Sequence, residues 1–129
     1  MLEHLENDEL ALGKIYSLLK KNGIAILSVP SRNAPLHKLG YTRGFDKRVG
    51  HVRRYTLDQL KSKVKQAGFT MLYSQKSEGI LRNFLFLNTI VGKSIRFIRF
   101  QISDIVSLLD QLFLKLFGES QIIIVIRKK

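Results

Sequence analysis

The sequence predicts an α/β fold in which helices cover a small sheet. Segments with helical spacing of apolar residues alternate with short strand-like runs, a pattern that favours helices packed against a sheet. The strand-like runs lie at about 24–29, 69–75 and 121–127. Three strands make a small sheet whose first strand would be an open edge. We therefore expect a partial domain, with further structure on its N-terminal side.

The first helix is predicted to begin at Asn7, which can cap it, and the acids at 8–9 suit the positive end of the helix dipole. An apolar stripe follows at i, i+3, i+4 and i+7, formed by Leu12, Ile15, Tyr16 and Leu19. Asn22-Gly23 supplies the left-handed turn that ends the helix. The apolar run 24–29, stopped by Pro30, then predicts a strand buried on both faces.

Residues 31–55 are predicted to form a connection without regular structure, which is usually either functional or disordered, since they are aperiodic and strongly basic, with Asp46 as the only acid. Thr56-Leu-Asp-Gln59 is a capping box that begins a second helix. Its buried stripe is Leu57, Leu60, Val64 and Ala67, and Gly68 closes it. Phe69, Met71 and Tyr73 then alternate with polar residues in the second strand, although Leu72 breaks the pattern.

The apolar region 80–117 predicts a helical insert of two helices joined near Gly92, before the last strand. Helical spacing relates Ile95, Ile98, Ile102, Ile105, Leu109 and Leu112. With Arg82, Lys93, Arg96 and Arg99 on other faces, the insert is typical of an interfacial amphipathic helix drawn to anionic lipid. The alternative is a hydrophobic helical pair packed on the sheet. Charges interrupt every window of the region, so no membrane-spanning helix is predicted.

The composition is basic, with 22 Lys and Arg against 10 Asp and Glu, a net charge of +12. Such a surplus attracts polyanions, but the basic residues are not interleaved with a nucleic-acid reading motif, so nucleic acid is not the expected partner. The absence of Cys excludes disulfides and thiolate chemistry. The acidic N-terminus is not a signal peptide. We expect a cytoplasmic protein, peripheral to the membrane if the insert binds lipid.

Four phrases resemble class I S-adenosylmethionine-dependent methyltransferases, in particular a bacterial branch of the methyltransferase-domain family. They are residues 1–10 with 15–23, the strand Ile24-Ala-Ile-Leu-Ser-Val-Pro30, the loop Gly50-His-Val-Arg-Arg-Tyr-Thr56, and Gln66-Ala-Gly-Phe69. The resemblance implies that residues 1–129 form the C-terminal half of a Rossmann-like fold, with 80–117 as a lid or membrane-facing insert. The family's Gly-rich turn and its ribose-binding acid have no counterpart, so the N-terminal cofactor-binding half is expected to be absent.

The resemblance implies methyl transfer from S-adenosylmethionine, with this chain supplying the acceptor side and inactive alone. The donor is already activated, so positioning supplies most of the effect and few catalytic residues are expected. His4 is the expected catalytic residue, which removes or orients an acceptor proton. Residues Leu2, Glu3 and His4 are expected to face the cofactor. The expected acceptor-binding residues are His51, Arg53, Arg54 and Tyr55, the two guanidinium groups clamping a phosphate or carboxylate.

Plainer roles are the alternatives for each of these residues. Glu3 and His4 could instead have no role beyond capping and solvating a helix start. One Arg could pair with an acid outside this chain, and Tyr55 could have a packing role alone. No metal site is predicted, although in some quinone-methylating relatives the Glu-His pair at this point helps to hold a divalent metal. The expected acceptor is a small or lipid-like molecule. The alternative function is a noncatalytic basic module that binds anionic membrane or a protein partner through 80–117.

Overall fold

The computed structural model describes residues 2–87 and 103–129 and confirms the α/β class. The elements, in chain order, are the 3-10 helix η1 (Leu2–His4), α1 (Asp8–Leu18), β1 (Ile24–Pro30), α2 (Pro35–Lys38), α3 (Arg43–Val49), α4 (Leu57–Gln66), β2 (Phe69–Ser77), α5 (Ile80–Leu87), α7 (Ser103–Phe117) and β3 (Gln121–Lys128). The three predicted strands are all present, each extended by one or two residues at its C-terminal end.

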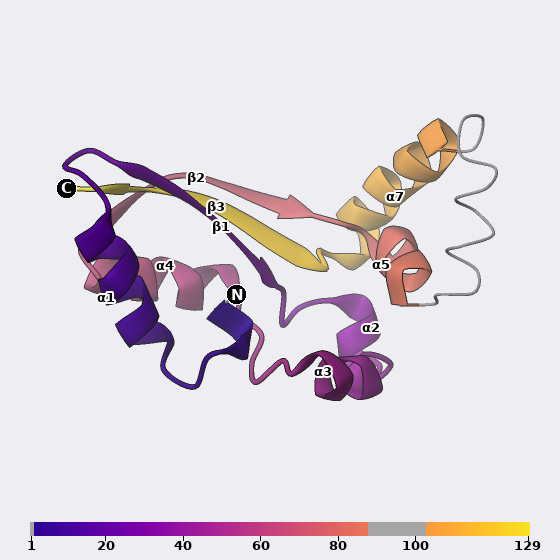
Figure 1. Cartoon of the computed structure of the whole chain (residues 1–129). Coiled ribbons are helices and arrows are strands. Elements are labelled where there is room, and N and C mark those ends of the chain that lie inside the picture. Colours follow the sequence, from indigo (N-terminus) through magenta and orange to yellow (C-terminus); the bar gives the residue numbers. More distant parts are fainter. Residues whose placement is uncertain (1, 88–102) are drawn as a thin grey trace.

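The sheet has the order β1-β3-β2, and β3 pairs antiparallel with both neighbours. The two strands that are distant in sequence from β3 therefore run parallel to each other on either side of it (Figure 1). The central position suits β3, because Ile122, Ile124 and Ile126 are completely buried. β1 lies at an edge of the described sheet, as the sequence predicts.

Helices α1 and α4 both pack on one face of the sheet and form the core with it (Figure 1). The predicted stripes supply this packing, since Leu12, Leu60 and Val64 are fully buried against the strands. Both reciprocal hydrogen bonds of the capping box are formed at the start of α4. Gly68 adopts a φ of 90° after that helix, a conformation that glycine adopts without strain.

The expectation that β1 is buried on both faces is wrong. Ile24 and Ile26 are 56% and 70% exposed, whereas Leu27 and Val29 are buried. The reason is that α1 and α4 lie on the same face, so no described helix covers the other (Figure 1). In β2 the irregular Leu72 marks a register shift between Met71 and Tyr73, a β-bulge that turns both Leu72 and Tyr73 toward solvent.

The expectation that residues 31–55 lack regular structure is also wrong, because α2 and α3 lie within them. Both helices are short, of four and seven residues, and neither has an apolar stripe that periodicity could reveal. The two ends of the segment meet at a parallel bridge between Ser31 and Tyr55. This closed loop places α2 and α3 beyond the C-terminal end of β1 (Figure 1).

In the described part of the insert, α5 and α7 pair with each other beyond the end of the sheet (Figure 1); the predicted division of the insert into two helices stays a prediction. Asp110 of α7 is buried and accepts hydrogen bonds from the backbone of Gly79 and Arg82, which caps the start of α5. The predicted joint at Gly92 and the charges at positions 93, 96 and 99 lie outside the described residues. Among the helices described, none is long and apolar enough to cross a bilayer.

Candidate functional site

A cavity of about 470 Å³ opens where β1 and β2 end and β3 begins, beside η1, α3 and α5. Ligands of open α/β sheets bind at the carboxyl ends of strands, so this is the expected place for a site. The residues that line the cavity are mostly polar, namely Glu3, His4, His51, Arg54, Glu78, Asn83, Ser120 and Gln121, with the apolar Pro30, Phe45, Val49 and Leu87.

Two backbone hydrogen bonds bring the N-terminal residues of the cavity to the loop before α4. The carbonyl of Glu3 accepts from the amides of Val52 and Arg53, at 2.7 and 3.3 Å. Leu2 is buried in the core at the same point, which anchors η1. Residues almost fifty positions apart thereby form one wall. The side chain of Leu2 packs in the core, and Glu3 and His4 line the cavity; their cofactor-facing role stays a prediction.

Asp8 contacts three side chains and thereby holds the loop before α4 in place. It accepts a hydrogen bond of 2.8 Å from the Tyr55 hydroxyl and forms ion pairs with Lys63 and Arg53. Burial raises the pKa of Asp8, but the hydrogen bonds from Lys63 and Tyr55 outweigh it, and the net pKa is lowered. Burial and the bond to Asp8 raise the pKa of Tyr55 far above its ordinary value, so this phenol stays protonated.

His4 and His51 face each other across the cavity wall, with ring centroids 4.8 Å apart. His4 Nδ1 lies 3.1 Å from the Gly50 carbonyl oxygen, and His51 Nδ1 lies 3.0 Å from an Asp46 carboxylate oxygen. Both oxygens can only accept, so each Nδ1 donates and each neutral ring keeps its lone pair on Nε2. Both rings can therefore take up a proton at Nε2.

Asp46 is the centre of a partly buried network that the sequence did not identify as part of the site. Arg54 binds it with two hydrogen bonds, of 2.7 and 3.0 Å, and Thr42 and His51 also donate to it. Burial raises the pKa of Asp46, but the hydrogen bonds and the charge of Arg54 outweigh burial, so the pKa lies below its ordinary range. The one signal in the sequence is that Asp46 is the only acid in a basic segment.

The four predicted acceptor-binding residues have different surroundings. His51 and Arg54 line the cavity, whereas Arg53 borders a smaller polar cavity and Tyr55 is 2% exposed in the core. The two guanidinium groups bind different carboxylates of this chain, Arg53 with Asp8 and Arg54 with Asp46. They do not converge into a clamp in this structure. An acceptor-binding role for the four residues stays a prediction.

Glu78 is a further cavity residue that the sequence reading missed. It has a φ of 57°, which is uncommon outside glycine, and it lines the cavity where β2 passes into α5. Burial raises the pKa of its carboxyl group; the charge of Arg82 opposes this, and that of Asp110 adds to it. A partly buried carboxyl group with a raised pKa is a candidate acid or base.

Glu3, His4 and His51 could together hold a metal ion. Their ligand atoms lie within 4.8 Å of one another, and His4 Nε2 is 3.6 Å from a Glu3 oxygen. Two imidazoles and a carboxylate form a donor set suited to divalent transition metals. The geometry thus permits an ion; the absence of a metal stays a prediction.

Comparison with known proteins gives a consistent result. A family model described as a methyltransferase domain matches residues 1–74. The chain is similar to a putative sarcosine dimethylglycine methyltransferase from Galdieria sulphuraria, with 12% identity and a TM-score of 0.57 over 99% of this chain and 50% of the other. No curated protein matches the sequence significantly.

Two further structures have the same fold. A phosphoethanolamine N-methyltransferase 2 from Haemonchus contortus, in complex with S-adenosyl-L-methionine, has 13% identity and a TM-score of 0.56 over 99% of this chain and 31% of the other. For a SAM-dependent methyltransferase from Archaeoglobus fulgidus the values are 16% and 0.57, over 99% and 56%. The chain thus spans from about a third to just over half of these proteins. Because the family model covers more than half of its residues, the chain belongs to the methyltransferase-domain family.

Proposed function

We propose that this chain is the acceptor-facing part of an S-adenosylmethionine-dependent methyltransferase. The observation that carries the proposal is the cavity at the ends of β1 and β2, where His4 and His51 present Nε2 atoms, in a chain of the methyltransferase-domain family. Family membership supports the methyl transfer, and the S-adenosyl-L-methionine bound to the Haemonchus protein supports the donor.

In the proposed reaction an oxygen or nitrogen of the acceptor attacks the methyl group of the sulfonium. The carbon–sulfur bond breaks, its electron pair stays on sulfur, and the donor leaves as a thioether. His4 Nε2 accepts the proton that the acceptor loses, because Nδ1 is occupied by the Gly50 carbonyl. His51 and Arg54, held by Asp46, position the acceptor in the cavity.

The proposed acceptor is a small molecule with a polar end and an apolar part. Its polar end lies toward His4, His51 and Arg54, and its apolar part toward Phe45 and Leu87. A cavity of about 470 Å³ is in the size range of small-molecule sites. The names of the similar proteins, which include sarcosine dimethylglycine and phosphoethanolamine methyltransferases, are consistent with a small acceptor.

We further propose that the main S-adenosylmethionine-binding motif lies outside this chain. The 129 residues contain no Gly-rich turn of the dinucleotide-binding type, and the chain spans only part of its structural relatives. Alone, the chain is therefore expected not to bind S-adenosylmethionine, while small acceptors still enter the cavity.

Two titrations of the isolated chain test whether it binds the acceptor but not the cofactor. Calorimetry with S-adenosylmethionine should give no binding, whereas NMR titration with phosphoethanolamine or sarcosine should shift the His4 and His51 ring signals. Tyr73, whose exposed ring belongs to β2 and not to the cavity lining, is the internal control. Clear binding of S-adenosylmethionine would refute the proposal that the main cofactor-binding motif lies outside this chain. If neither acceptor shifts the ring signals of His4 and His51, the proposal that this cavity binds the acceptor is contradicted.

The exposed apolar face of α7 favours a second function, peripheral binding to anionic membrane. Leu108, Leu112 and Leu116 are 70%, 52% and 65% exposed and lie at i, i+4 and i+8 along the helix. We propose that a cytoplasmic protein uses this face as a membrane contact, and that it presents a lipid-like acceptor to the cavity beside α5.

Flotation with vesicles that contain phosphatidylserine checks the membrane proposal. The chain is expected to float with the vesicles, and Leu108→Glu with Leu112→Glu should abolish flotation because two charges enter the contact face. Leu39→Glu is the control, since Leu39 is even more exposed, at 77%, but lies after α2, away from this face. Equal flotation of all three proteins would show that α7 makes no membrane contact.

A further inference from the structure

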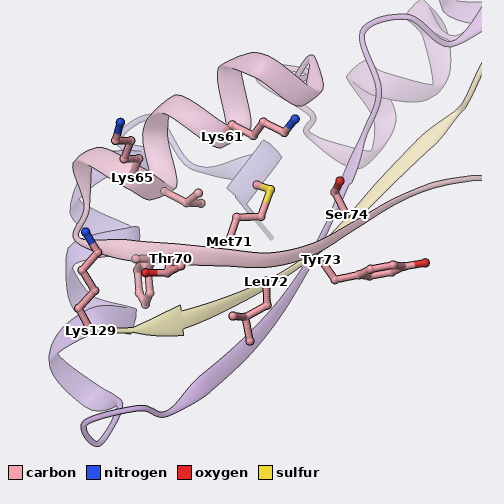
Figure 2. A pocket seen from close by; sticks show the side chains of 10 residues that line it. Lys61, Lys65, Thr70, Met71, Leu72, Tyr73, Ser74 and Lys129 are labelled. Carbon is pink, nitrogen blue, oxygen red and sulfur yellow. The ribbon is translucent and has the colours of Figure 1, made fainter.

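A second cavity, of about 610 Å³, lies along β2 and shares no residue with the acceptor cavity. It is lined by the consecutive strand residues 69–74, by α4 and by the C-terminal Lys129. Figure 2 shows α4 lying alongside the strand, with Lys61 and Lys65 on the helix and Lys129 near the start of the strand.

The cavity opens on the edge of β2. Successive strand residues point to opposite faces, so a cavity lined by six in a row follows the side of the strand and not one of its faces. In the described sheet, β2 pairs only with β3, and its other side carries no strand. An unpaired strand edge offers a row of backbone donors and acceptors to another chain.

The charges around this edge are positive. Lys61, Lys65 and Lys129 form no ion pair among the described residues, whereas Lys63, on another side of α4, binds Asp8 and Glu9. The three lysines thus lie along an open edge without counter-charges in the described part of the chain. A second copy of β2 would bring the same three charges against them, so pairing between identical edges is disfavoured.

The cavity also has apolar surface. Met71 is half-buried and Leu72 is 45% exposed, and Val64 and Phe69 lie beneath them. A partner that pairs with the edge can therefore bury alternate apolar side chains while its other side chains meet the lysines. The complementary partner is an extended segment that alternates acidic and apolar residues.

We propose that the edge of β2 binds an extended acidic polypeptide segment, which adds to the sheet as a fourth strand. Backbone hydrogen bonds to residues 69–74 supply the pairing, and Lys61, Lys65 and Lys129 select the acidic sequence. This interaction is independent of methyl transfer, because its residues are separate from the acceptor cavity.

NMR titration of the chain with a short peptide of alternating Glu and Val tests the proposal. Amide signals of residues 69–74 are expected to shift saturably, and their hydrogen exchange should slow as the new ladder forms. Affinity should fall at least tenfold between about 50 mM and 500 mM salt, since exposed charges are screened. The same peptide with Lys in place of Glu should not bind.

A charge-reversal pair gives the matched comparison. Lys61→Glu with Lys65→Glu should no longer bind the acidic peptide and should bind the basic one. Both side chains are exposed, so the substitutions should leave the fold intact. Lys20→Glu with Lys21→Glu changes the net charge equally at an exposed site after α1 and should bind as the wild type does.

Four results would overturn the proposal. The first is equal binding of acidic and basic peptides, and the second is unchanged binding by the Lys61 and Lys65 variant. The third is self-association of that variant together with no peptide binding by the wild type, which would show that the lysines only protect the edge against aggregation. Shifts with phosphatidylserine vesicles but not with the peptide would assign the edge to lipid instead.

Discussion

In the intact enzyme, His4→Asn is expected to lower kcat by about 10²–10⁴-fold, the usual contribution of a positioned general base. Asn can keep the hydrogen bond to the Gly50 carbonyl, because its amide nitrogen occupies nearly the position of Nδ1. It has no equivalent of Nε2, which is the atom proposed to take the proton. The measurement is steady-state transfer of a labelled methyl group from S-adenosylmethionine to a small acceptor.

The structure supplies a control for this substitution. His4 is exposed, so its replacement should change the free energy of unfolding by no more than about 0.5 kcal/mol. A loss of activity with unchanged stability then identifies a catalytic effect and not a folding defect. If His4→Asn keeps wild-type kcat while His51→Asn loses it, the proton passes to His51 and the proposed role of His4 is wrong.

Asp46→Asn is expected to destabilise the chain by about 1.5–3 kcal/mol, the usual contribution of hydrogen bonds between charged groups. The Arg54 side chain is 7% exposed and binds Asp46 through two nitrogens, so the substitution leaves a guanidinium group buried without its counter-charge. Urea unfolding at neutral pH measures the loss. Asp58→Asn, at an exposed position in the first turn of α4, should cost no more than about 1 kcal/mol.

The same carboxylate predicts how stability depends on pH. The pKa of Asp46 in the folded chain lies below its ordinary 3.8, so the unfolded chain binds the proton more readily. Its contribution is therefore complete above the ordinary pKa and is lost as the pH falls through the lowered folded value. Asp8 acts in the same direction. Asp46→Asn should make the acid-induced fall in unfolding free energy shallower, and an unchanged slope would contradict the assignment.

Asp46 also connects stability with the proposed reaction. It holds His51 Nδ1 and the Arg54 guanidinium group, and both side chains line the acceptor cavity. A substitution at Asp46 therefore moves two cavity residues at once, whereas His4 depends on the separate Gly50 contact. Substitutions at Asp46 and at His4 should therefore affect methyl transfer independently, because different contacts hold the residues concerned.

Part of the site was accessible from sequence because motif residues are contiguous. His4 and His51 were named from short phrases that resemble the family, and both line the cavity. Asp46 and Glu78 were not identified as site residues, since neither belongs to a recognisable motif. Glu78 lines the cavity beside residues distant in sequence, and Asp46 acts on the cavity through its hydrogen bonds to His51 and Arg54. Tyr55 and Arg53 belong to named motifs, yet their partner is Asp8 in α1.

The sequence by itself determined the elements whose signals are local. The capping box of α4, the stripes of α1 and α4, the turn at Gly68 and the three strands all depend on residues within a few positions of one another. Such interactions recur at helical or strand spacing and can be recognised without knowledge of the rest of the chain.

Only the tertiary structure decided how these elements meet. It placed β3 between β1 and β2, left one face of the sheet uncovered by described helices, and formed α2 and α3 inside an aperiodic segment. It also joined Glu3 to the loop before α4 and gathered Arg54 and His51 around Asp46. The Glu3 contact joins groups far apart in sequence, whereas the Asp46 contacts lie within one aperiodic loop. In both cases the partners are selected by burial and charge in the folded chain, which no periodic pattern records.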